Sequence, residues 1–415
     1  MSKNNNNFFV KKNDWSIIKD KLLQCYLMPY FQKVLMTGKP IYYVDCFSGK
    51  GKFDDGTDGS PLIALRIRDI CLSQSRLLKK AGAIKTCFID KNYGTELSFN
   101  IDAAAPTYDK PEVISGKFED NIEKCLRDKQ GYNVFLYIDP YGIKALDSNL
   151  FDKFQSYGFT SLEMLINFNS FGFFRDACRV MKVDCQNDSA LNDLEDLVEY
   201  DPTTVDSTTQ SMELLSRIAG GDYWKQIVIE FKKGTLDGYA AEQRLSYEYK
   251  QELKKRYTYV LDMPIRLKAN QRPKYRMIHV CDHEAGCFLM AQNMQKRKDE
   301  LFINIQQDGQ LSLYNMTSLG SSSAEGETYT RNEILEKVKQ HLKVVPSCIG
   351  ITKFLASFMT ENGLICEFKM IYDILNELSA SGVIDIIRQP SKTLQKRPTT
   401  FWEEKKGQSV TIRRR

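Results

Sequence analysis

The feature that most constrains the fold is a β-rich segment, residues 41–51, that runs into a glycine loop. Its sequence is IYYVDCFSGKG, in which four strand-forming residues lead to Asp45, and Gly49 and Gly51 follow at alternate positions. Glycine at both positions lets the backbone turn sharply and approach a ligand closely, because a Cβ atom would clash with the turn or with the ligand. The segment therefore predicts the first strand and the ligand loop of a nucleotide-binding α/β domain.

Four further strand-like segments follow, and helical patterns separate them. The predicted strands are residues 84–90, 111–116, 133–140 and 161–168, and the predicted helices between them are residues 62–77, 93–101, 121–127 and 146–157. Ser60 and Pro61 mark a helix start, because serine caps a helix and proline fits its first turn. The β-α-β-α order predicts an α/β fold with a parallel, doubly wound, Rossmann-like sheet.

The rest of the chain predicts an insertion, a linker and a second domain. Residues 169–256 are polar or helical and too long for a simple crossover, so we expect a helical insertion that covers or shapes a substrate cleft. Residues 316–327 are rich in glycine, serine and acidic residues, as in a linker. We therefore expect a first domain over residues 1–315, the linker at 316–327 and a second domain over residues 328–415.

The second domain has the pattern of a winged helix. Three short helices are predicted at residues 331–343, 351–360 and 368–381, followed by a β-rich segment at 383–387. A basic hairpin tip follows, with Arg388, Lys392, Lys396 and Arg397 before Phe401 and Trp402. Three helices and a basic hairpin together predict a winged helix.

The net charge of +5 lies in this second domain. Residues 328–415 hold 15 Lys and Arg against 9 Asp and Glu, whereas residues 1–327 hold 43 against 44. The surplus favours nucleic acid as a partner, although a mildly basic solvated surface explains it about equally well. Asp373 and Glu377 on the third helix disfavour simple docking in a major groove, so either the hairpin contacts the nucleic-acid backbone or the domain binds protein.

The composition points to the cytoplasm. No apolar run approaches the ~20 residues that a membrane span needs, and residues 1–7 are polar, so we expect no membrane partner. Eleven cysteines in mostly apolar surroundings are typical of buried thiols in a reducing compartment. His279, Cys281, His283 and Cys287 alternate along an apolar strand, where core residues are more common than metal ligands, so we expect no metal.

Three strand ends carry the candidate chemistry: the loop at 45–51, Asp90, and the segment 139–142. Ligands of an open parallel sheet bind beyond the carboxyl ends of its strands, where these residues should meet. A dinucleotide fingerprint needs a third glycine where Asp54 stands, and its acidic residue comes about 20 residues on, whereas Asp90 follows Gly51 by 39. The Gly-Lys-Ser/Thr of a phosphate-binding Walker loop is missing from this region.

The pattern Asp-x-Phe-x-Gly-x-Gly, a second-strand acid and Asp-Pro-Tyr resemble the S-adenosylmethionine-dependent methyltransferases, particularly those that modify exocyclic amines of nucleobases. The resemblance implies S-adenosylmethionine as cofactor, with its methionine portion in the glycine loop, its ribose near the second strand and its adenine after the third. The implied cofactor-binding residues are Asp45, Cys46, Phe47, Gly49, Gly51, Asp90, Lys91, Lys117 and Phe118. Asp90 could instead serve only to cap a helix.

The fourth strand end is suited to binding an amine. The Asp139 carboxylate and the Pro140 carbonyl can accept hydrogen bonds from an NH2 group and orient its lone pair, while Tyr141 stacks on the base. The motif departs from Asp-Pro-Pro-Tyr and is similar to the Asp-Pro-Phe-Gly of transfer-RNA guanine-N2 methyltransferases, so the identity of the base stays open. A simple strand-ending turn is the alternative reading.

A narrower resemblance is to the three-Cys-motif partner protein family, over residues 15–300, with the winged helix that some members carry. The segments that bear it are residues 43–51, 59–62, 137–142, 165–168, 220–224 and 283–290. It implies a methyltransferase-like fold, a separate partner protein with three cysteines, and a phage-defence or mobile-element setting. We therefore expect a methyltransferase that acts on nucleic acid. The alternative is a non-catalytic platform of the same fold that binds this partner or nucleic acid.

Overall fold

The computed structural model describes residues 9–12, 14–78, 82–140, 142–143, 145–184, 208–265, 275–307 and 329–415. Two compact units appear in it: Met1–Thr258 with Pro264–Cys281, and Tyr259–Met263 with Asp282–Arg415. The predicted linker at 316–327 and both of its boundaries lie outside the described residues.

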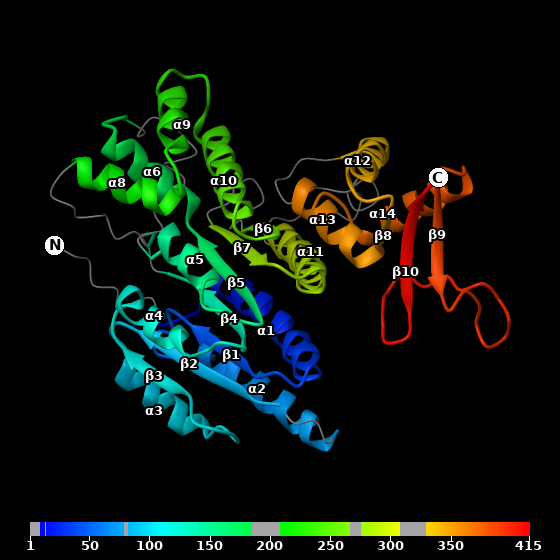
Figure 1. Cartoon of the computed structure of the whole chain (residues 1–415). Helices are drawn as coiled ribbons and strands as arrows, with labels where there is room; N and C mark the ends of the chain where they lie inside the picture. The colour runs from blue at the N-terminus through cyan, green and yellow to red at the C-terminus, as the bar shows by residue number, and fades with distance from the viewer. Residues whose placement is uncertain are drawn as a thin grey trace. The chain divides into compact units, whose positions relative to one another are not determined.

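A seven-stranded sheet, whose edge strand β6 belongs mostly to the second unit, provides the central strands of the first unit (Figure 1). Its order is β3-β2-β1-β4-β5-β7-β6, with β1 at Ile41–Asp45, β2 at Ile84–Asp90, β3 at Glu112–Ser115, β4 at Asn133–Ile138, β5 at Ser161–Phe168, β6 at Tyr259–Ile265 and β7 at Tyr275–Cys281. Strands β1 to β5 pair in parallel, and β7 pairs antiparallel with β5. The prediction of five parallel strands is confirmed. Their order is Rossmann-like, with the topological switch point between β1 and β4.

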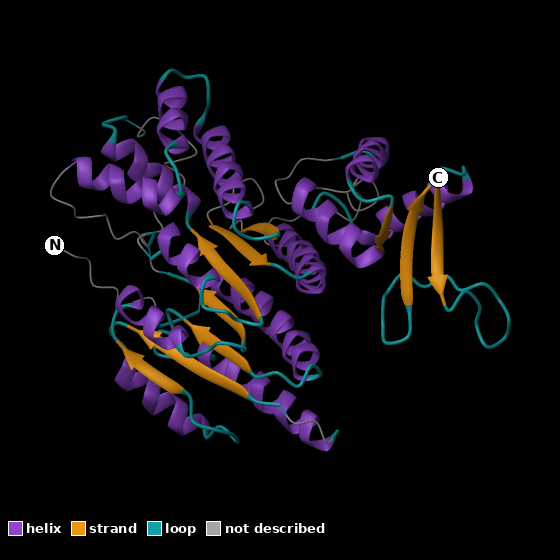
Figure 2. Ribbon diagram, viewed as in Figure 1, coloured by secondary structure: helices purple, strands orange, loops and turns teal. Residues whose placement is uncertain are grey.

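Helices cover both faces of this sheet, because neighbouring residues of β1 point to opposite sides. Tyr43 lies edge-to-face with Phe31 of α1 (Asp14–Leu35), with ring centroids 6.2 Å apart. On the opposite face, the Lys129 ammonium lies 4.8 Å from the Tyr42 ring, just after α4 (Phe118–Arg127). The result is a mixed α/β fold with a central sheet between helices (Figure 2).

The remaining helices of the unit connect the strands or follow β5. They are α2 (Ser60–Leu77), α3 (Gly94–Ala104), α5 (Ser148–Gln155), α6 (Ser170–Val180), α8 (Thr208–Ala219), α9 (Tyr223–Lys232) and α10 (Gly238–Lys254). The predicted start of α2 at Ser60 and Pro61 is confirmed. The described part of the interval 169–256 lies in the last four of these helices and their connections.

Buried charged groups join these helices to the sheet. The Arg276 guanidinium on β7 donates to Glu242 of α10 at 2.7 and 2.9 Å, and both side chains are buried. His279, predicted as a core residue, is fully buried, and its Nε2 lies 3.1 Å from Glu163 Oε2. Each group lies beside an oppositely charged or polar partner, which offsets the cost of removing it from water.

The second unit contains a long helix, α11 (Glu284–Gln307), and a small α/β assembly. Its other helices are α12 (Arg331–Val344), α13 (Ile351–Asn362) and α14 (Phe368–Ala380), and its strands β8 (Cys348–Gly350), β9 (Ile384–Gln389) and β10 (Ser409–Arg414) pair antiparallel in the order β8-β10-β9. The three predicted helices are confirmed. In the described part of the chain, no helix has both the length and the apolar character that crossing a membrane requires.

Candidate functional site

The carboxyl ends of β2, β1 and β4 converge, as the sequence predicts. After β1, the Cys46 N–H donates to the Tyr137 carbonyl of β4 at 2.9 Å, and the Ser48 N–H donates to the Ile89 carbonyl of β2 at 3.0 Å. The glycine loop is therefore held between its two neighbouring strands. Asp45, Asp90 and Asp139, which end or follow these strands, lie at the same edge of the sheet.

The loop needs glycine for two physical reasons. Gly49 and Gly51 have φ angles of +58° and +75°, in the left-handed region that other residues seldom adopt. A Cβ atom on Gly51 would stand only 2.7 Å from Leu97 Cδ1 of α3. The loop is thus shaped by its own turn and by the close packing of α3.

Asp90 holds the glycine loop in place. Its Oδ2 accepts a hydrogen bond from the Gly49 N–H at 2.8 Å, and its Oδ1 accepts bonds from the Asn92 and Tyr93 N–H groups, both at 2.8 Å. A carboxylate offers about four acceptor sites, so one site on Oδ2 remains for a ligand hydroxyl. Asp90 therefore organises the turn before α3 without capping the helix itself, and it retains one acceptor site. Its neighbour Lys91 is exposed.

Two predicted aromatic residues meet on the other side of the loop. The Phe47 and Phe118 rings have centroids 5.2 Å apart, and Phe118 is buried at the start of α4. Lys117, just before it, is exposed. Cys46 is buried behind the loop, where burial raises the pKa of its thiol well above the ordinary value. Half-buried Phe47 and exposed Lys117 are thus available to border a planar ring, whereas buried Phe118 supports the Phe47 ring.

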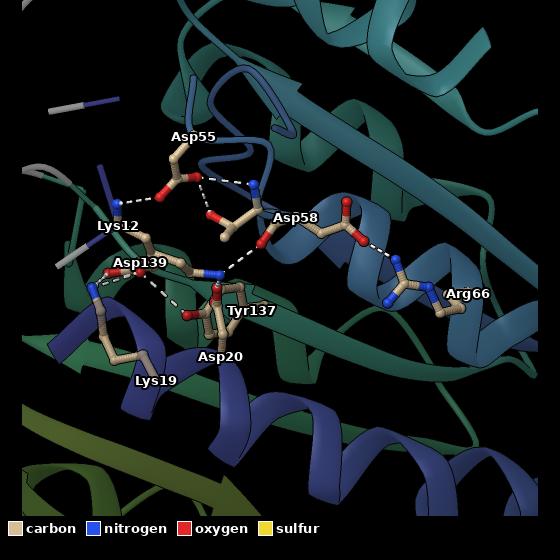
Figure 3. A network of polar contacts seen from close by, with 9 residues as sticks. Lys12, Lys19, Asp20, Asp55, Asp58, Arg66, Tyr137 and Asp139 are labelled. Atoms are coloured by element: carbon tan, nitrogen blue, oxygen red, sulfur yellow. Dashed lines mark hydrogen bonds and ion pairs between the residues drawn. The ribbon is translucent and has the colours of Figure 1, made fainter. Parts of the chain in front are cut away.

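Asp139 receives hydrogen bonds from three side chains on three different elements, of which Figure 3 shows Lys19 and Tyr137. The Lys19 ammonium on α1 donates to both carboxylate oxygens, at 2.9 and 2.8 Å. Asn167 Nδ2 donates to Oδ1 at 2.7 Å, and the Tyr137 hydroxyl donates to Oδ2 at 3.2 Å. Pro140 is half-buried beside them. The predicted stacking residue Tyr141 lies outside the described residues.

Asp20, Asp45 and Asp139 form an acidic cluster. Burial raises the pKa of Asp45 to about 7, with the charges of Asp139 and Asp20 adding to the rise. Burial likewise raises the pKa of Asp20 to about 6 against the opposing effect of Lys12, with which Asp20 forms an ion pair. Asp45 Oδ2 is buried and makes no hydrogen bond of ordinary geometry with the described residues, although the nearby Ser60 side chain partly offsets the rise in the pKa of Asp45.

Residues 9–12, before α1, lie on the glycine loop. The Asp54 N–H donates to the Phe9 carbonyl at 2.8 Å, and the Lys12 ammonium donates to the Asp58 carbonyl at 2.6 Å (Figure 3). The Phe9 ring lies edge-on to Tyr93, with centroids 5.0 Å apart, and a Cβ on Gly49 would meet this ring at 3.1 Å. The N-terminal segment is therefore part of the site.

Sequence reasoning missed Lys19, Asn167 and the contribution of residues 9–12. Asn167 precedes the last residue of β5, so its place at the sheet edge could have been inferred from the strand pattern. Lys19 lies 120 residues before Asp139, and no local motif connects the two.

Comparisons with known proteins leave the site to be interpreted from its own geometry. No family model and no curated protein matches the chain. Among solved structures, the chain is similar to the plantazolicin methyltransferase BamL in complex with a triazolic desmethylPZN analog and SAH, with a TM-score of 0.27 and 11% identity. The match covers 65% of this chain and 86% of that chain. At this level of similarity the match carries no inference about fold or chemistry.

The raised pKa of Asp45 predicts how its replacement changes stability with pH. Because the pKa is about 7 in the folded chain and near 3.8 in the unfolded chain, the folded state holds the proton more tightly, and stability falls as pH rises from about 4 to 7. The asparagine side chain of Asp45→Asn stays neutral at every pH, so the variant does not lose this stability. The difference between the unfolding free energies of the variant and the wild type should therefore rise with pH, by on the order of 2 kcal/mol. Urea unfolding between pH 5 and pH 8 measures the difference.

Asp54→Asn is the matched control for this prediction, because Asp54 lies in the same region and its side chain is 55% exposed. Its unfolding free energy should follow that of the wild type at every pH. Parallel pH profiles for Asp45→Asn and the wild type would contradict the assignment of a buried, proton-holding Asp45.

Proposed function

We propose that this chain is an S-adenosylmethionine-dependent methyltransferase that acts on an exocyclic amine of nucleic acid. The observation that carries the proposal is the meeting of the glycine loop, Asp90 and Asp139 at the carboxyl edge of the sheet, beside the switch point between β1 and β4. Ligands of open α/β sheets bind at this place.

The residues at this edge fit the parts of the proposed cofactor. Asp90 keeps one acceptor site for a ribose hydroxyl, and Phe47, supported by buried Phe118, can border an adenine. Asp45 supplies a buried carboxyl oxygen without a regular hydrogen bond, which suits the ammonium of the methionine portion. Cys46, Gly49 and Gly51 shape the loop, whereas Lys91 and Lys117 are exposed and suited to the outer side of the nucleotide.

The proposed acceptor site consists of Asp139, Pro140 and Tyr141. When bound, S-adenosylmethionine supplies an electrophilic methyl group, and the protein has to orient the amine lone pair toward it. Carboxylate and carbonyl acceptors orient an NH2 group through its hydrogens, and this positioning lowers the barrier without a nucleophilic side chain. Tyr141 is assigned to stacking on the base, as the motif implies.

We further propose that the C-terminal assembly of α12, α13, α14 and the β9–β10 hairpin is a winged helix that binds nucleic acid through its tip. The tip carries three exposed cations that form no ion pair with any described residue: Lys392, Lys396 and Arg397. The surrounding segment, residues 391–402, contains no acidic side chain. The Trp402 ring stacks on the Tyr372 ring of α14, with centroids 4.7 Å apart, and the Arg388 guanidinium lies 4.8 Å from the Trp402 centroid. These contacts connect the base of the hairpin to α14.

Replacing the three tip cations with glutamine should weaken binding to nucleic acid. We expect Lys392→Gln/Lys396→Gln/Arg397→Gln to lose roughly tenfold in affinity for a random duplex, and the slope of log K against log salt to fall by about 2 to 3. Fluorescence anisotropy with DNA and RNA duplexes at several salt concentrations measures both values.

The control for the tip is Lys339→Gln/Lys343→Gln/Lys353→Gln, which removes the same charge from the same unit. Its slope of log K against log salt should differ from that of the wild type by no more than about 1. Equal losses of nucleic-acid affinity in the two triple variants would mean that the tip contributes only through net charge. Unchanged affinity in the tip variant would refute a role of the tip in binding.

The cofactor assignment is tested by calorimetric titration with S-adenosylmethionine and S-adenosylhomocysteine. Both should bind the wild type, and Gly51→Ala should lower the affinity roughly tenfold, because its Cβ would collide with Leu97 and its φ is +75°. Gly56→Ala is the control: its φ is +85°, but a Cβ there meets no described atom within 4 Å.

If neither ligand produces binding heat at protein concentrations far above the expected dissociation constant, the proposed methyltransferase activity is rejected. The rival function would then be favoured, in which the same fold is a non-catalytic platform for nucleic acid or for a three-cysteine partner protein. Equal affinities for Gly51→Ala and Gly56→Ala would instead place the ligand away from the glycine loop.

A further inference from the structure

The carboxylate proposed to orient the substrate amine has no unused acceptor site. Asp139 receives four hydrogen bonds: two from Lys19, one from Asn167 and one from Tyr137. A carboxylate accepts about four hydrogen bonds in total. A substrate amine can therefore reach Asp139 only when one of these three donors leaves.

Lys19 is the donor that can leave. Tyr137 and Asn167 lie on β4 and β5, which pair in parallel, and both side chains are buried. Lys19 is also buried, but it reaches Asp139 from α1 on a flexible four-carbon stem and not from the sheet. Its ammonium already lies 5.6 Å from the centroid of the Tyr275 ring, so a cation–π contact is close to its present position.

A second acceptor in the site lacks a donor. Asn167 is 4% exposed, and its Oδ1 atom has no hydrogen-bond partner in the part of the chain that the structure describes. The amide orientation is fixed chemically, because Nδ2 donates to Asp139, and the flipped amide would place two acceptors together. A group at Asp139 with two N–H donors could thus satisfy both the carboxylate and Asn167 Oδ1, whereas a hydroxyl has one donor.

From this geometry we propose that Lys19 is an internal stand-in for the acceptor amine. Its ammonium holds the position that a substrate NH2 group must take, and the substrate displaces it from Asp139. The inference rests on the proposed function and narrows it: the site selects acceptors with at least two N–H donors, as in the exocyclic amines of adenine, cytosine and guanine, over hydroxyl and carbon acceptors. Lys19 is a specificity-determining residue that acts through competition for Asp139.

Lys19→Met tests the proposal, because methionine keeps an unbranched side chain and removes the N–H donors. Ligand-observed NMR titration should show adenosine and cytidine binding roughly tenfold more tightly to Lys19→Met than to the wild type. Inosine and uridine, in which a carbonyl replaces the amine, should show no gain. Lys19→Arg, which retains donors and charge, should resemble the wild type, as should Lys21→Met, an exposed control on the same helix.

A second variant covers the case in which Lys19→Met does not fold. Lys19→Ala can be prepared with n-propylammonium, which replaces the missing side-chain atoms from Cγ to Nζ. Adenosine and cytidine should then displace propylammonium from the site, and inosine and uridine should not. In Lys19→Met/Asp139→Asn, the selectivity for amine-bearing nucleosides should disappear.

The outcomes separate this inference from the proposed function. Equal gains for amine-bearing and carbonyl-bearing nucleosides, or no gain in a folded Lys19→Met, overturn the inference even if S-adenosylhomocysteine binds. Selective gain without any binding of S-adenosylhomocysteine supports the amine site and rejects the methyltransferase.

Discussion

The hydrogen bond from the Gly49 N–H to the Asp90 carboxylate is the interaction on which the arrangement of the site depends. It is charge-assisted, and it fastens the loop after β1 to the end of β2. Contacts from Cys46 to Tyr137 and from Ser48 to Ile89 attach the same loop to both neighbouring strands. The convergence of three strand ends is therefore maintained by the protein's own backbone, and a ligand would meet an already formed loop.

A second constraint is the charge balance beside this loop. The charges of Asp139 and Asp20 add to the rise in the pKa of Asp45, and the charge of Asp139 adds to the rise in the pKa of Asp20. Lys12 and Lys19 supply the compensating positive charge. Both lysines belong to the N-terminal segment and α1, so this segment is electrostatically part of the site. Cationic or amine ligands would compete with these lysines for the same carboxylates.

Local patterns predicted the parts of the fold that local physics determines. Apolar runs ending in Asp45 and Asp90 identified two parallel strands and the place where they end, and Ser60-Pro61 identified the start of α2. The engagement of Asp139 by Lys19 could not be predicted, because it joins residues 120 positions apart through tertiary packing. The resemblance to the three-Cys-motif partner family stays a prediction, since no family model matches. The winged helix and the roles assigned to the site residues likewise stay proposals.

Hydrogen exchange with and without S-adenosylhomocysteine, read by mass spectrometry, tests the central claim most directly, because it locates the cofactor on the chain. We predict slower exchange in peptides that cover residues 45–51 and 90–93 at saturating ligand, and unchanged exchange in α12 to α14 of the second unit. Unchanged exchange at 45–51 and 90–93 under the same conditions, or protection confined to other segments, would contradict the claim that these strand ends form the cofactor site.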